Sequence, residues 1–203
     1  MEGAHNSGWF VGQKMRLPQT KEEVETWYPV VYGTQDGGKS WQRLFTGPEN
    51  PYPLWDVWPV SSTDVWVVGV SILHTTDAGK TWAEVHMPSR PEVSGMPSSV
   101  QFLDSNYGWM TTNQGGDAYW FTSDGGKTWD VRGESTPDDL AFRRVVYSSP
   151  SDVWAVSGGV FHSDDGGKTW TKVLSGNYSR IQYLKDKRVL FATGHKLARY
   201  KLP

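Results

Sequence analysis

Four aspartates recur at regular intervals along this chain, and their carboxylates are the first candidates for chemistry. Asp36, Asp77, Asp124 and Asp165 lie 41 to 47 residues apart, each within the pattern Ser/Thr-x-Asp-x-Gly-x-Ser/Thr-Trp. A calcium loop gathers several carboxylates in a short stretch, whereas each of these boxes supplies mainly one. An aspartate beside glycine more often accepts hydrogen bonds from the backbone of a tight turn. We therefore predict that these aspartates cap turns, and we predict no metal site.

Histidines and lysines recur with the boxes. His74 and His162 both stand three residues before the box aspartate, where Gly33 and Phe121 stand in the other copies. The sequence contains no His-x-His or His-x-x-x-His pair of the kind that holds zinc. We therefore interpret these histidines as part of the repeat. One lysine lies inside every box, and we expect these lysines to form a solvated ring on one face: Lys39, Lys80, Lys127 and Lys168.

A second repeated feature indicates the elements that position the boxes. Trp9, Trp66, Trp109 and Trp154 each lie in a short apolar stretch before a box, and Leu190 takes this place in a fifth copy. Each stretch predicts a β-strand. The second copy predicts four strands, at residues 56–60, 65–69, 72–75 and 81–86. A repeat of about 40–50 residues with four strands is typical of a β-propeller blade. Each box ends in a tryptophan that we expect to be buried against the neighbouring blade: Trp41, Trp82, Trp129 and Trp170.

The repeated box resembles the Asp-box, also called the BNR repeat, and its copies extend over nearly the whole chain. The units are most similar to those of the photosystem II stability/assembly factor-like group, and sialidases carry the same boxes. This resemblance implies an all-β propeller of four-stranded antiparallel blades. It does not fix the function, because Asp-box propellers include glycosidases, lectins and assembly scaffolds.

The composition agrees with a folded all-β domain and excludes several classes of protein. The 203 residues can bury a core without disulfides, and 12 tryptophans with 22 glycines indicate aromatic packing between tight turns. The net charge of −2 argues against a protein that coats nucleic acid. The absence of cysteine excludes thiol chemistry. No apolar run reaches the length of a membrane span and no signal peptide is visible, so we expect no membrane insertion. The compartment stays open, since a parent protein could be exported or lie on the cell surface.

The ends of the chain do not complete a repeat. We predict one propeller domain over residues 1–203, with units at about 1–46, 55–87, 99–132, 143–175 and 179–203. The first unit lacks its first strand and the last unit lacks its box and last strand, so the expected strand numbers are three, four, four, four and three. These features favour a piece of a longer propeller. Open blade edges would also permit self-association.

Loop lengths predict which face binds. We call the strands of a unit A to D; antiparallel order brings the A–B turns and the boxes to one face, and the B–C loops and D–A linkers to the other. The long connections all fall on the second face, which we call the long-loop face: residues 13–28, 46–54, 87–98, 114–118 and 132–140. Variable loops on a rigid scaffold usually carry function. We therefore predict binding on this face, where Trp27 lies in the first insertion.

The A strands begin at the long-loop face, so their first residues would surround the mouth of a central channel. In register, these residues are Asp56, Ser99, Arg144 and Arg180, with Arg143 adjacent. Two residues further on lie Trp58, Gln101, Val146 and Gln182, and the apolar residues between them should be buried: Val57, Val100, Val145 and Ile181. The arginines could hold a carboxylate or phosphate. Alternatively, they form solvated ion pairs with Asp56, Asp138 or Asp139 that contribute little to stability.

Two classes of function stay open. We favour a non-enzymatic binding or assembly scaffold that recognises a protein partner through the long-loop face, with no cofactor. The alternative is a carbohydrate-active propeller, either a lectin or a sialidase-like glycoside hydrolase, using exposed aromatic side chains as sugar platforms: Trp27, Tyr52, Trp55, Tyr119 and Trp120. A hydrolase needs two carboxylates that face one bond. Few acids are available for this on the long-loop face, and Met15-Arg16-Leu17-Pro18 matches the sialidase Arg-Ile-Pro motif only within an insertion, so we assign no catalytic residue. The candidate acids are Asp56, Glu134, Asp138 and Asp139.

Overall fold

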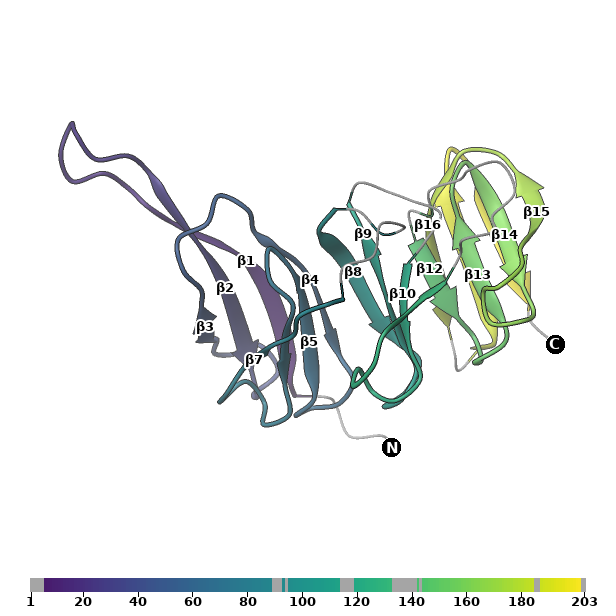
Figure 1. Ribbon diagram of the computed structural model, residues 1–203, viewed down its shortest axis with the longest axis horizontal. Coiled ribbons are helices and arrows are strands. Elements are labelled where there is room, and N and C mark those ends of the chain that lie inside the picture. Colours follow the sequence, from purple (N-terminus) through teal and green to yellow (C-terminus); the bar gives the residue numbers. More distant parts are fainter. Residues whose placement is uncertain are drawn as a thin grey trace. The chain divides into compact units, whose positions relative to one another are not determined.

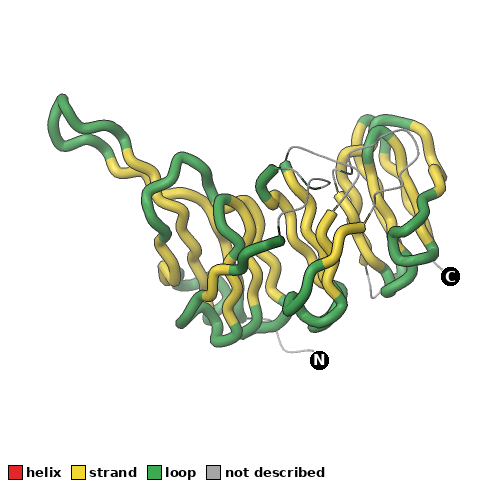
Figure 2. Tube along the Cα trace, viewed as in Figure 1, coloured by secondary structure: helices red, strands yellow, loops and turns green. Residues whose placement is uncertain are grey.

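The chain folds into antiparallel β-sheets joined by turns (Figures 1 and 2). The computed structural model describes residues 6–88, 93, 95–113, 119–132, 142, 144–184 and 187–201. Within these residues there is no helix long and apolar enough to cross a membrane.

Eighteen strands form five separate sheets in the described part of the chain, with three, four, four, four and three strands. This is the predicted series, so the prediction of antiparallel blades with incomplete first and last sheets is confirmed. The strands of the first two blades are β1 (Gly8–Arg16), β2 (Thr26–Thr34), β3 (Gln42–Thr46), β4 (Leu54–Pro59), β5 (Val65–Gly69), β6 (Leu73–Thr75) and β7 (Ala83–Glu84). Those of the other three are β8 (Pro97–Phe102), β9 (Gly108–Thr112), β10 (Tyr119–Thr122), β11 (Asp130–Arg132), β12 (Arg144–Tyr147), β13 (Val153–Val156), β14 (Gly159–Ser163), β15 (Thr171–Ser175), β16 (Tyr178–Leu184), β17 (Val189–Gly194) and β18 (Leu197–Lys201).

The contacts divide the chain into two compact units, each with its own core. Unit 1 contains residues 1–87 and 96–100, and unit 2 contains residues 88–95 and 101–203. The core of unit 1 gathers around Val31, Val65 and Val67 from the first two blades. The core of unit 2 is larger and rich in aromatic residues, with Tyr147 and Phe161 at 2 % or less exposure.

The boxes form the turns that the sequence predicts. In every box the aspartate Oδ1 accepts the hydroxyl of the residue two before it at 2.7–2.9 Å. It also accepts the backbone N–H of the residue four after it at 2.9 Å, and Oδ2 accepts that residue's hydroxyl at 2.6 Å. The carboxylate thus holds both ends of the turn, which confirms the turn-capping role.

These hydrogen bonds favour the charged carboxylate. The hydroxyls of Ser40, Thr81 and Thr128 contribute most, and the pKa of Asp36, Asp77 and Asp124 falls to about 2 from an ordinary 3.8. Burial opposes the shift at Asp165, but the bonds from Thr169 and Ser163 still hold its pKa well below the usual range.

The boxes and the A–B turns lie on the same face. The backbone N–H after each box aspartate donates at 2.7–3.0 Å to a carbonyl just before strand B of its own blade, which in blades two to four belongs to the A–B turn. The four pairs are Gly37 with Asn6, Ala78 with Thr63, Gly125 with Asn106 and Gly166 with Ser151. The predicted pairing of boxes with A–B turns on one face is therefore confirmed.

The box tryptophans differ in burial. Trp129 and Trp170 are buried and donate Nε1–H to the carbonyls of Gly126 and Gly167, both at 3.1 Å, as the sequence leads us to expect. Trp82 is half-buried. Trp41 is 42 % exposed, so the prediction is wrong there.

The exposure of Trp41 follows from the face on which it lies. Its ring contacts Phe10, which is itself 45 % exposed. Successive residues of a strand point to opposite faces, so Phe10 points away from the face that carries Trp9. It is Trp9 that meets Trp82 of the second blade.

The fifth blade corrects one sequence assignment. The A strands keep the predicted register, because Asp56, Arg144 and Arg180 pair with Val68, Val156 and Thr193. However, Gln182 pairs with Phe191, as Val146 pairs with Trp154, so Phe191 and not Leu190 takes the tryptophan position. In the fourth blade, residues 148–152 connect the paired residues Tyr147 and Val153. In the fifth blade, residues 184–189 connect the corresponding pair, Tyr183 and Leu190, so the A–B turn is one residue longer. A shift of one residue exchanges the two faces of a strand.

Candidate functional site

The first B–C insertion forms a long two-stranded hairpin, which we call the arm (residues 13–29). β1 and β2 stay paired as far as Arg16 and Thr26, with Met15 opposite Trp27. In Figure 1 the arm extends beyond the β1–β3 sheet. Its tip is exposed and includes apolar side chains, with Leu17 at 58 % and Val24 at 75 % exposure. An exposed apolar tip on a ribbon of two strands is typical of a contact surface.

The first D–A linker supports the base of the arm. Asn50 N–H donates to the carbonyl of Trp27 at 2.8 Å, and Gly47 N–H donates to that of Pro29 at 2.9 Å. In the other direction, the Gln13 side-chain amide donates a hydrogen bond to the carbonyl of Asn50 at 3.2 Å. The predicted neighbourhood of a B–C loop and a D–A linker is therefore present in unit 1.

Asp56 has a structural partner that the sequence did not reveal. Its Oδ2 accepts the hydroxyl of Ser99 at 2.9 Å and the N–H of Val100 at 3.1 Å, both on β8. Its Oδ1 accepts the N–H of Val57 at 3.0 Å. The carboxylate thus connects two neighbouring A strands.

The two candidate arginines lie in unit 2 at equivalent positions of neighbouring A strands. β12 and β16 are in contact, and Arg144 and Arg180 occupy the same register on them. Arg144 is half-buried and Arg180 is exposed. The residues that follow them, Val145 and Ile181, are buried as predicted. Two arginines at equivalent positions of neighbouring strands suit the binding of a carboxylate or a phosphate.

The other predicted site residues differ in their exposure. Tyr119 and Trp120 are 1 % and 4 % exposed, so the expectation that they are exposed sugar platforms is wrong. All four residues of β10 are buried, so this strand has no exposed side. Trp27, Trp55 and Trp58 are half-buried, and Tyr52 is 52 % exposed. Several candidates lie outside the described residues: Arg143, Glu134, Asp138, Asp139 and the loop 114–118.

The histidines form part of the repeat, as predicted. His74 Nε2 lies 2.9 Å from Asp64 Oδ1, and the imidazole stacks on Trp66 with ring centres 4.0 Å apart. His162 repeats this arrangement with Asp152 at 2.6 Å and Trp154 at 4.3 Å. Each aspartate belongs to an A–B turn, so the hydrogen bond connects that turn to strand C.

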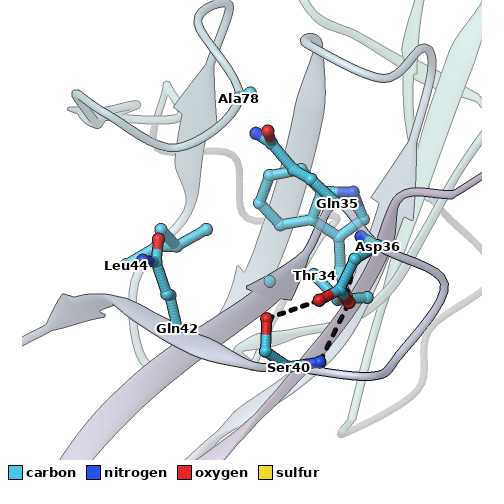
Figure 3. A pocket seen from close by; sticks show the side chains of 9 residues that line it. Thr34, Gln35, Asp36, Ser40, Gln42, Leu44 and Ala78 are labelled. Atoms are coloured by element: carbon cyan, nitrogen blue, oxygen red, sulfur yellow. Dashed lines mark hydrogen bonds between the residues drawn. The ribbon is translucent and has the colours of Figure 1, made fainter.

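A pocket of about 240 Å³ opens in unit 1 beside the first box (Figure 3). In the figure dashed lines join the Asp36 carboxylate to Ser40, Gln42 lies beside Leu44, and Gln35 extends toward Ala78. Its lining is Trp9, Gly33, Thr34, Gln35, Asp36, Ser40, Gln42, Leu44 and Ala78. Reasoning from sequence did not identify this pocket, although Gly33 in a place otherwise held by a ring was a usable signal.

Comparison with known proteins identifies related chains. The family model for photosynthesis system II assembly factor YCF48 matches residues 2–138, and the BNR/Asp-box repeat model matches residues 161–172. A curated relative, photosystem II assembly protein Ycf48 of Thermosynechococcus vestitus, is 26 % identical over 193 residues, covering 88 % of this chain and 53 % of the relative. The chain thus spans about half the length of that relative.

Solved structures with similar folds include a YCF48 bound to a D1 peptide and an ancestral GH74 enzyme. The first has a TM-score of 0.43 at 19 % identity, covering 96 % of this chain and 97 % of the other. The second has a TM-score of 0.56 at 18 % identity, covering 89 % of this chain and 27 % of the other. The GH74 likeness supports the propeller fold and carries no information on activity.

Proposed function

Because the chain belongs to the photosynthesis system II assembly factor YCF48 family, we propose that it is a non-catalytic scaffold that binds a segment of a protein partner. The observation that carries this proposal is the family match over residues 2–138, which includes the whole arm. The arm and the linker that supports it form the contact surface in unit 1.

The chemistry of the arm supports a protein partner. Its tip combines exposed Leu17 and Val24 with charges of both signs, including Lys21 and Glu23. Apolar groups surrounded by mixed charges are typical of protein interfaces with a polar rim. The tip is locally ordered by a bond from Gln19 N–H to Glu23 Oε2 at 2.9 Å.

Arg144 and Arg180 provide the anion-binding part of the proposal. They lie on neighbouring strands at one register, and guanidinium groups bind carboxylates through directional, charge-assisted bonds. A partner segment with an acidic side chain or a terminal carboxylate fits this pair. The carbohydrate alternative has less support, since two of its five aromatic platforms are buried.

The test measures binding of a D1 peptide, which is the partner present in the solved YCF48. Isothermal titration compares the protein with Arg144→Ala and Arg180→Ala. We expect each variant to weaken binding by about 1.5–3 kcal/mol, the range for hydrogen bonds to charged groups. Lys39→Ala and Lys168→Ala remove the same charge at the boxes and should change binding little, because exposed charges are screened.

Two results would overturn the proposal. If the protein does not bind the peptide, the assignment of this partner segment is wrong. If the lysine and arginine variants lose affinity equally, binding is diffuse electrostatics and the arginine pair is not a site. Circular dichroism of every variant checks that the fold is kept.

A further inference from the structure

The first blade lacks a ring that the next three blades have. Opposite the B-strand tryptophan, strand C places His74, Phe121 and His162 in blades two, three and four, through the pairs with Trp66, Trp109 and Trp154. In the first blade Trp9 pairs with Gly33. The pocket described above lies at this position.

Neighbouring side chains take up the space directly beside Gly33. An added Cβ would lie 2.6 Å from Leu44 Cδ1 and 3.1 Å from the Trp9 ring, so these two side chains lean over the glycine. The pocket of about 240 Å³ stays open next to them. Pockets for drug-sized ligands hold about 300–1,000 Å³, so this one suits a single side chain.

Two tryptophans at this junction lack the hydrogen bonds that their counterparts make. Within the described residues, the buried Nε1 atoms of Trp9 and Trp82 have no acceptor. By contrast, Trp109 Nε1–H donates to the carbonyl of Val145 at 2.6 Å, and the Trp129 and Trp170 indoles donate to box glycines. Because both N–H groups are buried, they do not bond a ligand themselves, and the Trp9 N–H serves as a reporter of what enters the pocket beside its ring.

The walls and rim define the chemistry of a ligand. Trp9, Leu44 and Ala78 offer an aromatic and an aliphatic surface. The lining also includes the Asp36 carboxylate and the side-chain amides of Gln35 and Gln42. In-box bonds occupy Asp36 Oδ1 twice and Oδ2 once, and the Lys39 backbone N–H also bonds to this carboxylate, so Asp36 offers a ligand chiefly its negative charge. Acceptors, one negative charge and an indole together match a guanidinium, which donates in one plane and stacks on aromatic rings.

We propose that the pocket between the first and second boxes binds the side chain of an arginine in a peptide ligand. The guanidinium bonds to Asp36 and the two glutamines, and the aliphatic stem lies against Leu44 and Ala78. This site goes beyond the proposed function, because the pocket belongs to the boxes of unit 1 and uses neither the arm nor the arginine pair.

The test uses N-acetyl-arginine methylamide as the probe and its citrulline analogue, which has the same shape without the charge. Proton–nitrogen NMR follows the indole N–H of Trp9, which Trp9→Phe assigns. We expect a saturable shift with the arginine probe, in about the millimolar range expected for one side chain. The citrulline analogue should bind at least about tenfold more weakly, since it lacks the charge-assisted bond.

Two variants locate the site. Gly33→His adds the ring that blades two and four carry and should abolish the shift. Gln42→Leu keeps the size of the side chain, removes one amide and should weaken binding about three- to tenfold. Gln182→Leu, the same change at an exposed glutamine of unit 2, is the matched control and should bind as the parent does.

Specific outcomes would overturn the assignment. Equal affinity for both probes would mean that charge is not recognised. A shift that persists in Gly33→His, or that Gln182→Leu reduces as much as Gln42→Leu does, would place the site elsewhere. If Gly33→His does not fold, Gln42→Leu and the citrulline comparison still decide. The D1 peptide assay uses other residues, so either proposal can fail alone.

Discussion

At the residue scale, the box aspartates couple the stability of the turns to pH. Their folded-state pKa is about 2 for Asp36, Asp77 and Asp124, whereas an aspartate in an unfolded chain titrates near 3.9. Between these values the unfolded chain binds more protons than the folded one, so stability falls as the pH falls. The contribution is complete above about pH 4 and is lost toward pH 2.

We therefore predict an acid-dependent loss of stability that a single substitution reduces. The urea midpoint of the protein should fall steadily from about pH 4 to pH 2. Asp77→Asn should be less stable at neutral pH. Its stability should fall less between about pH 4 and pH 2, because one of the box carboxylates that take up protons on unfolding is absent. Glu84→Gln, which removes an exposed carboxylate on β7, should keep the parent slope. If the urea midpoint of Asp77→Asn falls with pH as steeply as that of the parent, the box carboxylates are not the groups that make stability depend on pH.

A second residue-scale prediction concerns backbone strain in the second box. Ala78 has φ of 62°, where the other boxes place Gly37, Gly125 and Gly166 at 74° to 78°. A left-handed conformation destabilises a residue that has a Cβ by about 1–2 kcal/mol. Compared with glycine, alanine recovers about 0.4–1 kcal/mol of this, because it makes the unfolded chain less flexible.

Ala78→Gly should therefore raise the free energy of unfolding by up to about 1 kcal/mol. Gly125→Ala should lower it by about 1–2 kcal/mol or more, because the new Cβ would also lie 2.8 Å from the Ser105 carbonyl oxygen. Urea unfolding measures both. Changes of the same sign in the two variants would contradict this explanation.

At the element scale, the arm has a tip that is separable from its base. The bond at the tip is local, from Gln19 to Glu23, whereas the base is held by Asn50 and Gly47 of the linker. Replacing residues 17–25 by Asn-Gly, a turn that suits two paired strands, should change the free energy of unfolding by less than about 0.5 kcal/mol. Removing residues 13–29 should destabilise the first blade clearly. A large loss in the shorter deletion, measured by urea, would mean that the tip packs on the fold.

The sequence predicted most elements because each blade repeats the same physical signals. The strand predicted at residues 65–69 is β5 as observed, and the strand number of every blade is correct. The predictions that were wrong or incomplete depend on residues outside the local sequence pattern. One extra turn residue moved Phe191 into the place given to Leu190, and Trp120 lies on a strand whose four residues are all buried. The bond between Asp56 and Ser99 joins different blades, so no local pattern encodes it.

At the scale of the whole molecule, stability resides in two units that have separate cores. The buried cluster around Val67 belongs to unit 1, and that around Val156 belongs to unit 2. Repeat folds transmit stability mainly between nearest neighbours, so a local defect raises local opening first. Both valines are fully buried and lie at the centre of β5 and at the end of β13.

This arrangement predicts that the two units respond independently to matched core defects. Val67→Ala should speed amide hydrogen exchange in β5 and β6 and leave β12–β14 unchanged, and Val156→Ala should do the reverse. The reason is that each cavity weakens contacts within its own cluster. Exchange followed by mass spectrometry on peptides from both units measures the effect. If either substitution speeds exchange equally in both units, the chain opens as one cooperative body and the separation of the cores has no energetic consequence.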